Sequence, residues 1–180
     1  MLKIEIPEQE YYDEVKGEFF TVKAHTLSLE HSLVSISKWE SKWKKPYIDD
    51  KEKTDAEFRD YIRCMNMTQN VDPRVFDCLT YDKLNEIAQY INDPMSATWF
   101  STKEKNKKNG EVVTSELIYY WMTALNIPME CQKWHLNRLL TLIRIAGEKN
   151  QPPKKMSKND ILKQNKALNA KRRARAKSRG

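Results

Sequence analysis

The chain has 180 residues, of which 39% are hydrophobic and 32% charged, a balance typical of a globular protein rather than a disordered one. No apolar run approaches the roughly 20 residues that a membrane-spanning helix needs, and the acidic first residues do not resemble a signal peptide. The three cysteines, Cys64, Cys78 and Cys131, form no CxxC pair, which argues against a disulfide framework. We therefore expect a cytoplasmic protein that makes no contact with a membrane.

The net charge of +7 is unevenly distributed along the chain. Residues 151–180 contain eleven Lys or Arg and one acidic residue, a net charge of +10, which leaves −3 for the rest of the chain. This split predicts a basic arm attached to a mildly acidic body, and such an arm suits an acidic protein partner or nucleic acid.

The N-terminal segment shows the two-residue period of β-structure. Alternating apolar residues predict strands at 2–6 and 19–23, and 26–30 can add a third. We therefore predict a small antiparallel β-sheet within residues 1–30, which needs a covering helix to be stable.

From residue 31 onward the apolar period becomes helical. Leu33, Ile36, Trp39 and Trp43 predict a helix that ends before Pro46, and Thr54 with Glu57 forms a capping box that opens a second. Three more helices are predicted at 74–79, from Thr80 to residue 92, and at 115–126. A further helix is predicted at 128–146 and should end at Gly147. It should form a tight helical hairpin with the helix at 115–126.

Two segments are predicted to lack regular structure. Residues 101–110 have no apolar period, which predicts an exposed loop, and Gln151-Pro152-Pro153 is predicted to be a linker. A final helix is predicted from about residue 157 to 175, rich in Ala, Lys and Arg but poor in apolar anchors, so it needs a partner. The predicted fold is α+β, mostly α: a globular body at 1–150, with the sheet at 1–30 and helices at 31–150, and an arm at 151–180.

The sequence offers one pair of residues for chemistry, Cys131 and His135, which a helix would place on one face as a metal pair or a thiol–imidazole dyad requires. A buried structural cysteine is the more common outcome. Motifs of nucleotide-binding, hydrolase and metalloprotease sites are absent from the sequence. We therefore expect no enzyme, no catalytic residue, no metal and no cofactor.

Partner binding is the alternative to catalysis. Trp43 lies beside lysines at a helix end, and Trp99-Phe100 borders the polar loop, so both can mark exposed contacts. Clustered arginines in the arm suit phosphate or carboxylate groups. The candidate partner-binding residues are Trp43, Trp99, Phe100, Lys171, Arg172, Arg173 and Arg175.

Three stretches carry a family resemblance: EHSLVSISKWESKWKKP, MTQNVDPRVF, and VVTSELIYYWMTALNIPMECQKWHLNRLLTLIRIAGEKNQPPKKMSK, in which WHLNRLLTLI is the most distinctive block. From about residue 1 to the C-terminus, the chain resembles the tail assembly chaperones of tailed bacteriophages. The resemblance implies a non-enzymatic factor in the host cytoplasm that binds the long helical tape measure protein and helps to recruit tail tube protein. It transfers no partner-contacting residue to a position in this chain.

Other interpretations stay open. The chain can be a structural virion protein of the tail or neck whose arm packs on neighbouring subunits, or a nucleic-acid-binding protein that acts through its arm. A second copy of the chain is a further candidate partner.

Overall fold

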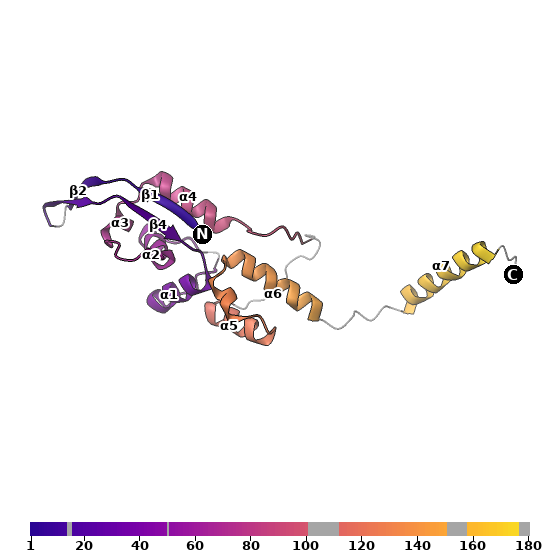
Figure 1. Cartoon of the computed structure of the whole chain (residues 1–180). Helices are drawn as coiled ribbons and strands as arrows, with labels where there is room; N and C mark the ends of the chain where they lie inside the picture. The colour runs from indigo at the N-terminus through magenta and orange to yellow at the C-terminus, as the bar shows by residue number, and fades with distance from the viewer. Residues whose placement is uncertain (14–15, 50, 101–111, 151–157, 177–180) are drawn as a thin grey trace. The chain divides into compact units, whose positions relative to one another are not determined.

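The computed structural model describes residues 1–13, 16–49, 51–100, 112–150 and 158–176 (Figure 1). Its internal contacts divide the chain into two units, residues 1–146 and residues 147–180. The fold is α+β and mostly α, as predicted, with antiparallel strands at the N-terminus and helices after them. The predicted loop at 101–110 and the predicted linker at 151–153 lie outside the described residues.

Four short strands form two antiparallel pairs. β1 (Leu2–Ile6) pairs with β4 (His25–Leu29), and β2 (Gln9–Asp13) pairs with β3 (Glu18–Val22). The chain thus runs out along β1 and β2 and returns along β3 and β4. Strand β2 was not predicted, because its sequence QEYYD lacks apolar alternation; pairing with β3 defines it instead.

The first two helices begin where their capping residues predict. In α1 (Leu33–Trp43) the Ser32 hydroxyl accepts a hydrogen bond from the Ser35 amide, and in α2 (Asp55–Met65) the capping box of Thr54 and Glu57 is complete. Such caps satisfy amides that have no partner inside the helix. The local sequence is therefore enough to fix both starts.

Three further helices also match their predictions. A short helix, α3 (Arg74–Asp77), follows Asp72, whose Oδ1 accepts a hydrogen bond from the Arg74 amide at 2.9 Å. Thr80 precedes α4 (Tyr81–Asn92), and Thr114 caps α5 (Ser115–Ala124) by accepting from the Leu117 amide.

The predicted helix at 128–146 was wrong in both of its limits. The structure has a 3-10 helix, η1 (Met129–Lys133), then an extended Trp134, and then α6 (Leu136–Asn150), which runs through Gly147. The break arises because His135 forms an antiparallel bridge with Ser32 and the Leu136 amide donates to the His31 carbonyl oxygen at 2.7 Å. This long-range pairing replaces the predicted tight helical hairpin, and α5 and η1 both pack on α1.

The second unit holds α7 (Lys158–Ala176), close to its predicted limits. No helix in the described ranges combines the length and apolar character that crossing a bilayer requires.

The core of the first unit lies between the β1–β4 pair and the helices. Ile4, Ile6, Leu27 and Leu29 face inward from the two strands and are buried. Helix α4 packs on β1, and Asn66 and Met67, which follow α2, pair with the edge of β4. The fully buried Trp39 of α1 joins this core, and its Nε1 donates to the Glu57 carbonyl oxygen of α2 at 3.0 Å.

One buried carboxylate connects three segments. Glu40 of α1 is 7% exposed, and its two oxygens accept hydrogen bonds of 2.8 Å from the Tyr47 amide and from the Ser115 amide. Ser115 is the first residue of α5, where amides lack partners within the helix and the helix dipole favours a negative charge. Glu40 therefore anchors both the turn after α1 and the start of α5.

We predict that Glu40→Ala lowers the free energy of unfolding by about 3 kcal/mol, because the buried Ser115 amide and the partly buried Tyr47 amide lose their acceptor. Glu40→Gln is expected to lie between wild type and Glu40→Ala, because its single carbonyl oxygen satisfies only one amide. Urea unfolding followed by circular dichroism measures both changes. Glu8→Ala, at an exposed position, is the control, and a loss for Glu40→Ala no larger than for this control would contradict the assignment.

Candidate partner-binding surfaces

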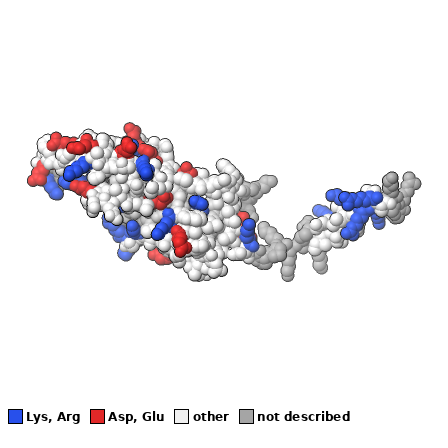
Figure 2. Space-filling model, viewed as in Figure 1, with Lys and Arg blue, Asp and Glu red and all other residues white. Residues whose placement is uncertain are grey.

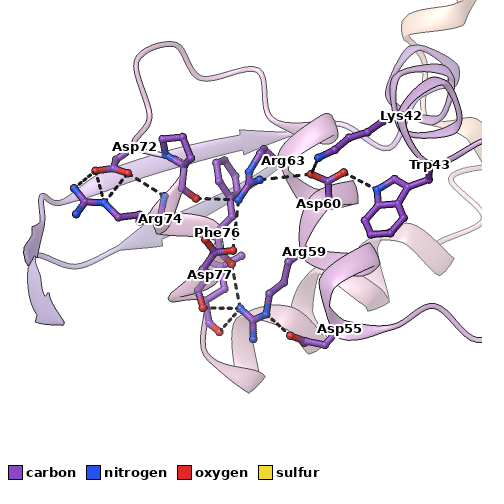
Figure 3. Close-up of polar contacts among 12 residues, drawn as sticks. Lys42, Trp43, Asp55, Arg59, Asp60, Arg63, Asp72, Arg74, Phe76 and Asp77 are labelled. Atoms are coloured by element: carbon purple, nitrogen blue, oxygen red, sulfur yellow. Dashed lines mark hydrogen bonds and ion pairs between the residues drawn. The ribbon is translucent and has the colours of Figure 1, made fainter. Parts of the chain in front are cut away.

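Trp43, a predicted partner-binding residue, is already engaged within the body. Its Nε1 donates to Asp60 Oδ2 at 2.7 Å (Figure 3). Its ring also stacks on Trp39, with centroids 5.9 Å apart. Lys42 forms an ion pair with the same carboxylate, and Arg63 approaches it at 3.5 Å. Trp43 is half-buried and holds α1 on α2, so its free surface is small.

The Asp60 carboxylate is held ionised by these neighbours. Burial alone raises the pKa of Asp60, but hydrogen bonds from Lys42 and Trp43 outweigh burial and keep the pKa below its usual value. The arrangement is an ion-pair network that joins two helices.

Arginines of α2 fix the short helix α3. The Arg59 guanidinium donates to three carbonyl oxygens, those of Phe76, Asp77 and Leu79, at 3.0–3.2 Å, and forms an ion pair with Asp55 (Figure 3). These contacts satisfy carbonyl groups that a helix leaves unpaired at its C-terminus. The pattern is that of a structural clamp.

Trp99 and Phe100 have different environments although they are adjacent. Trp99 is 91% exposed, whereas Phe100 is half-buried beneath the Arg144 guanidinium of α6, which lies 3.8 Å from the ring centroid. Only Trp99 therefore offers an exposed aromatic surface of the kind predicted.

The basic arm residues Lys171, Arg172, Arg173 and Arg175 all lie on α7 and are exposed. Figure 2 shows Lys and Arg side chains over much of this helix. The predicted partner-binding residues thus occupy separate elements: α1, the segment after α4, and α7.

An open groove that sequence reasoning missed lies between residues 51–58 and α4. Phe58, Leu84 and Ala88 give it an apolar lining, and Tyr81, which is 81% exposed, stands beside them. Charged side chains border this lining: Lys51, Glu52, Lys53 and Asp55. The available signal was the pair of apolar positions four residues apart on α4, Leu84 and Ala88.

The candidate dyad, Cys131 and His135, does not share a helical face. Cys131 is buried in η1, and His135 precedes α6 in the bridge to Ser32. Among the residues that the structure describes, no group of three or more His, Cys, Asp or Glu side chains is placed to hold a metal ion.

Two buried histidines lie where several helices meet. His31 Nδ1 shares a hydrogen bond of 2.5 Å with the Tyr61 hydroxyl of α2, and the His31 and His135 rings meet edge-on with centroids 5.0 Å apart. His135 Nε2 lies 3.0 Å from the carbonyl oxygen of Tyr90 in α4. Within the described ranges, His135 Nδ1 is buried without a partner.

Burial keeps both imidazoles neutral. Burial, with a smaller contribution from His135, lowers the pKa of His31 to about 3. Burial also lowers the pKa of His135, although its hydrogen bond to Tyr90 acts in the opposite direction. Their ring contacts and hydrogen bonds make them part of the packed core, where a neutral ring is favoured.

We predict that the free energy of unfolding falls as the pH decreases from about 6.5 to 5. The unfolded chain takes up protons on both histidines near pH 6.5, whereas burial lowers both pKa values in the folded chain, so stability present above pH 6.5 is lost as the pH falls below it. Each histidine contributes up to about 1.4 kcal/mol per pH unit.

The paired carboxylates stay ionised across this window, because hydrogen bonds keep the pKa values of Glu57 and Asp60 low. Urea unfolding at several pH values measures the slope, and His31→Gln should reduce it. His25→Gln, outside the cluster, is the control. An unchanged slope in His31→Gln would contradict the prediction.

Comparison with known proteins adds no relative: no protein-family model, no curated protein and no solved structure matches the chain.

Proposed function

We propose that this protein is a tail assembly chaperone of a tailed bacteriophage, a non-enzymatic factor that binds the tape measure protein and keeps it soluble until tail tube subunits assemble around it. The sequence resemblance is the reason for proposing the tape measure protein as the client. The single structural observation that carries a binding role is α7.

Helix α7 is basic and exposed, as expected of a segment that binds a partner. Its nineteen residues contain seven Lys or Arg and one acidic residue, and every side chain that the structure describes in it is exposed. A helix gains most of its stability in proteins from burying an apolar face, and α7 buries none within its own unit. A protein surface with carboxylates would neutralise its charge and cover Ile161, Leu162 and Leu168, which are 43–64% exposed.

The groove between residues 51–58 and α4 supplies a second contact. An amphipathic client helix can place apolar side chains against Phe58, Leu84 and Ala88, while its polar face meets the charged rim. This mode of binding suits a long helical client, because the groove contacts an apolar stripe that recurs along the helix and does not require one particular sequence motif. An account based on Cys131 and His135 has less support, because both are buried and His135 is packed against His31 and Tyr90.

The charge of α7 favours one alternative, binding to nucleic acid. Lys and Arg contacts to phosphates release counterions, so such binding weakens steeply as salt rises and depends little on apolar contacts. Replacing Ile161 and Leu168 by serine separates the two functions. Client binding should weaken, whereas nucleic-acid binding should not.

We predict that co-expression with the tape measure protein raises the soluble fraction of that protein several-fold. The triple substitution Arg172→Glu, Arg173→Glu and Arg175→Glu should remove most of the gain, because it reverses the charge that the C-terminal half of α7 offers to carboxylates. The matched control replaces the same three arginines by lysine, which keeps the charge. Soluble and pelleted fractions after lysis give the measurement.

A tape measure protein that stays equally insoluble with and without this chain would contradict the proposal. Mass spectrometry of purified particles addresses the remaining alternative. Stoichiometric presence of the chain in virions would favour a structural tail or neck protein, whereas a chaperone should be scarce there.

A further inference from the structure

The β2–β3 hairpin has one covered face. Tyr11 and Phe20 point to this side and stack with centroids 5.9 Å apart. The Arg74 guanidinium at the start of α3 lies 4.3 Å from the centroid of the Phe20 ring, and the Tyr11 hydroxyl donates to the Cys78 carbonyl oxygen at 3.5 Å. Helix α3 and the residues after it therefore support the inner face.

The opposite face of the hairpin carries an exposed aromatic pair. Tyr12 and Phe19 are directly opposite in the strand register, their ring centroids are 4.9 Å apart, and they are 54% and 70% exposed. Both rings project from a paired strand, where each contacts the other. Adjacent exposed aromatic rings on a regular element are typical of a contact surface.

A carboxylate lies beside this aromatic pair. Glu10 is on the same face as Tyr12, two residues earlier in β2, and is exposed; Glu5 of β1 and Glu8 before β2 are also exposed. Figure 2 shows Asp and Glu side chains gathered over the part of the body where Figure 1 places β1 and β2. A complementary ligand therefore combines apolar side chains with positive charge.

Helix α7 carries that combination on one face. Ile161, Leu168, Arg172 and Arg175 are separated by seven, four and three residues, which places all four side chains on the same side of an α-helix. Leu168 and Arg172 are about 6 Å apart along the helix axis, close to the spacing of about 7 Å between Tyr12 and Glu10 along a strand. The apolar and charged positions of the two elements thus match in order and in spacing.

The helix reaches this face more readily from a second copy than from its own chain. Figure 1 places the hairpin and the C-terminal part of α6 at opposite ends of the first unit. A seven-residue connection such as 151–157 can span at most about 25 Å, which limits the surfaces that α7 can reach on its own chain. Two copies face no such restriction.

We propose that the outer face of the β2–β3 hairpin, formed by Tyr12, Phe19 and Glu10, binds α7 of a second copy of this chain. Each copy then offers one helix and one hairpin, so the contact joins unlike surfaces, and two copies can exchange helices reciprocally. This inference goes beyond the proposed function and does not depend on the identity of the client.

The test uses the full chain and two variants whose changes lie at exposed positions. The hairpin variant carries Tyr12→Ser and Phe19→Ser, and the helix variant carries Arg172→Glu and Arg175→Glu. Light scattering after size-exclusion chromatography at low ionic strength should give a dimeric mass for wild type and a monomeric mass for each variant. Truncating a central aromatic pair should weaken association by roughly tenfold or more.

An equimolar mixture of the two variants is the decisive sample. It retains one intact helix and one intact hairpin on different chains, so it should form a one-to-one dimer although each variant alone is monomeric. Tyr120→Ser, at an aromatic residue of α5 that is 66% exposed, and Lys163→Glu, on the opposite face of α7, are matched controls that should associate as wild type does.

A monomeric wild type, a hairpin variant that still dimerises, or a mixture that stays monomeric would each overturn the proposal. Circular dichroism of both variants separates loss of binding from loss of fold. Because no client is present in these samples, failure here leaves the result of the co-expression test unaffected.

Discussion

The junction at His31 positions most of the helices of the body. The His31 carbonyl oxygen accepts the first amide of α6, its ring shares a hydrogen bond with Tyr61 of α2, and its neighbour Ser32 both caps α1 and bridges to His135. His135 then contacts the carbonyl group of Tyr90 in α4. Breaking any of these buried hydrogen bonds would leave a polar group without a partner, so the bonds fix the relative positions of the elements around them.

Local signals were sufficient for the parts of the fold that depend on neighbouring residues. The capping box at Thr54 and Glu57 and the apolar stripe of α1 predicted helices that the structure confirms. The start of α6 at Leu136 was missed, because it depends on a partner, His31, more than one hundred residues away. Glu40 was likewise not predicted to be buried, since its two amide partners come together only in the folded chain.

The candidate surfaces also divide into those that the local sequence predicts and those that depend on the folded chain. The charge and composition of α7 were evident in the sequence, and its helical structure is confirmed. The groove beside α4 and the aromatic pair of the hairpin require knowledge of which faces stay uncovered, which local periodicity does not provide. Trp43 was predicted to face a partner, but Asp60 binds its indole within the body, a contact between two helices that spacing alone does not reveal.

We propose that α7, whose described side chains are all exposed, becomes a stable helix when it binds a partner. Amide hydrogen exchange of residues 158–176, compared between the dilute free chain and its complex with the tape measure protein, tests that claim most directly. If so, the amides of α7 should exchange rapidly in the free chain and at least about a hundredfold more slowly in the complex, because packing against a partner opposes opening of the helix. Equal exchange in both states, or slow exchange in the dilute free chain, would contradict it.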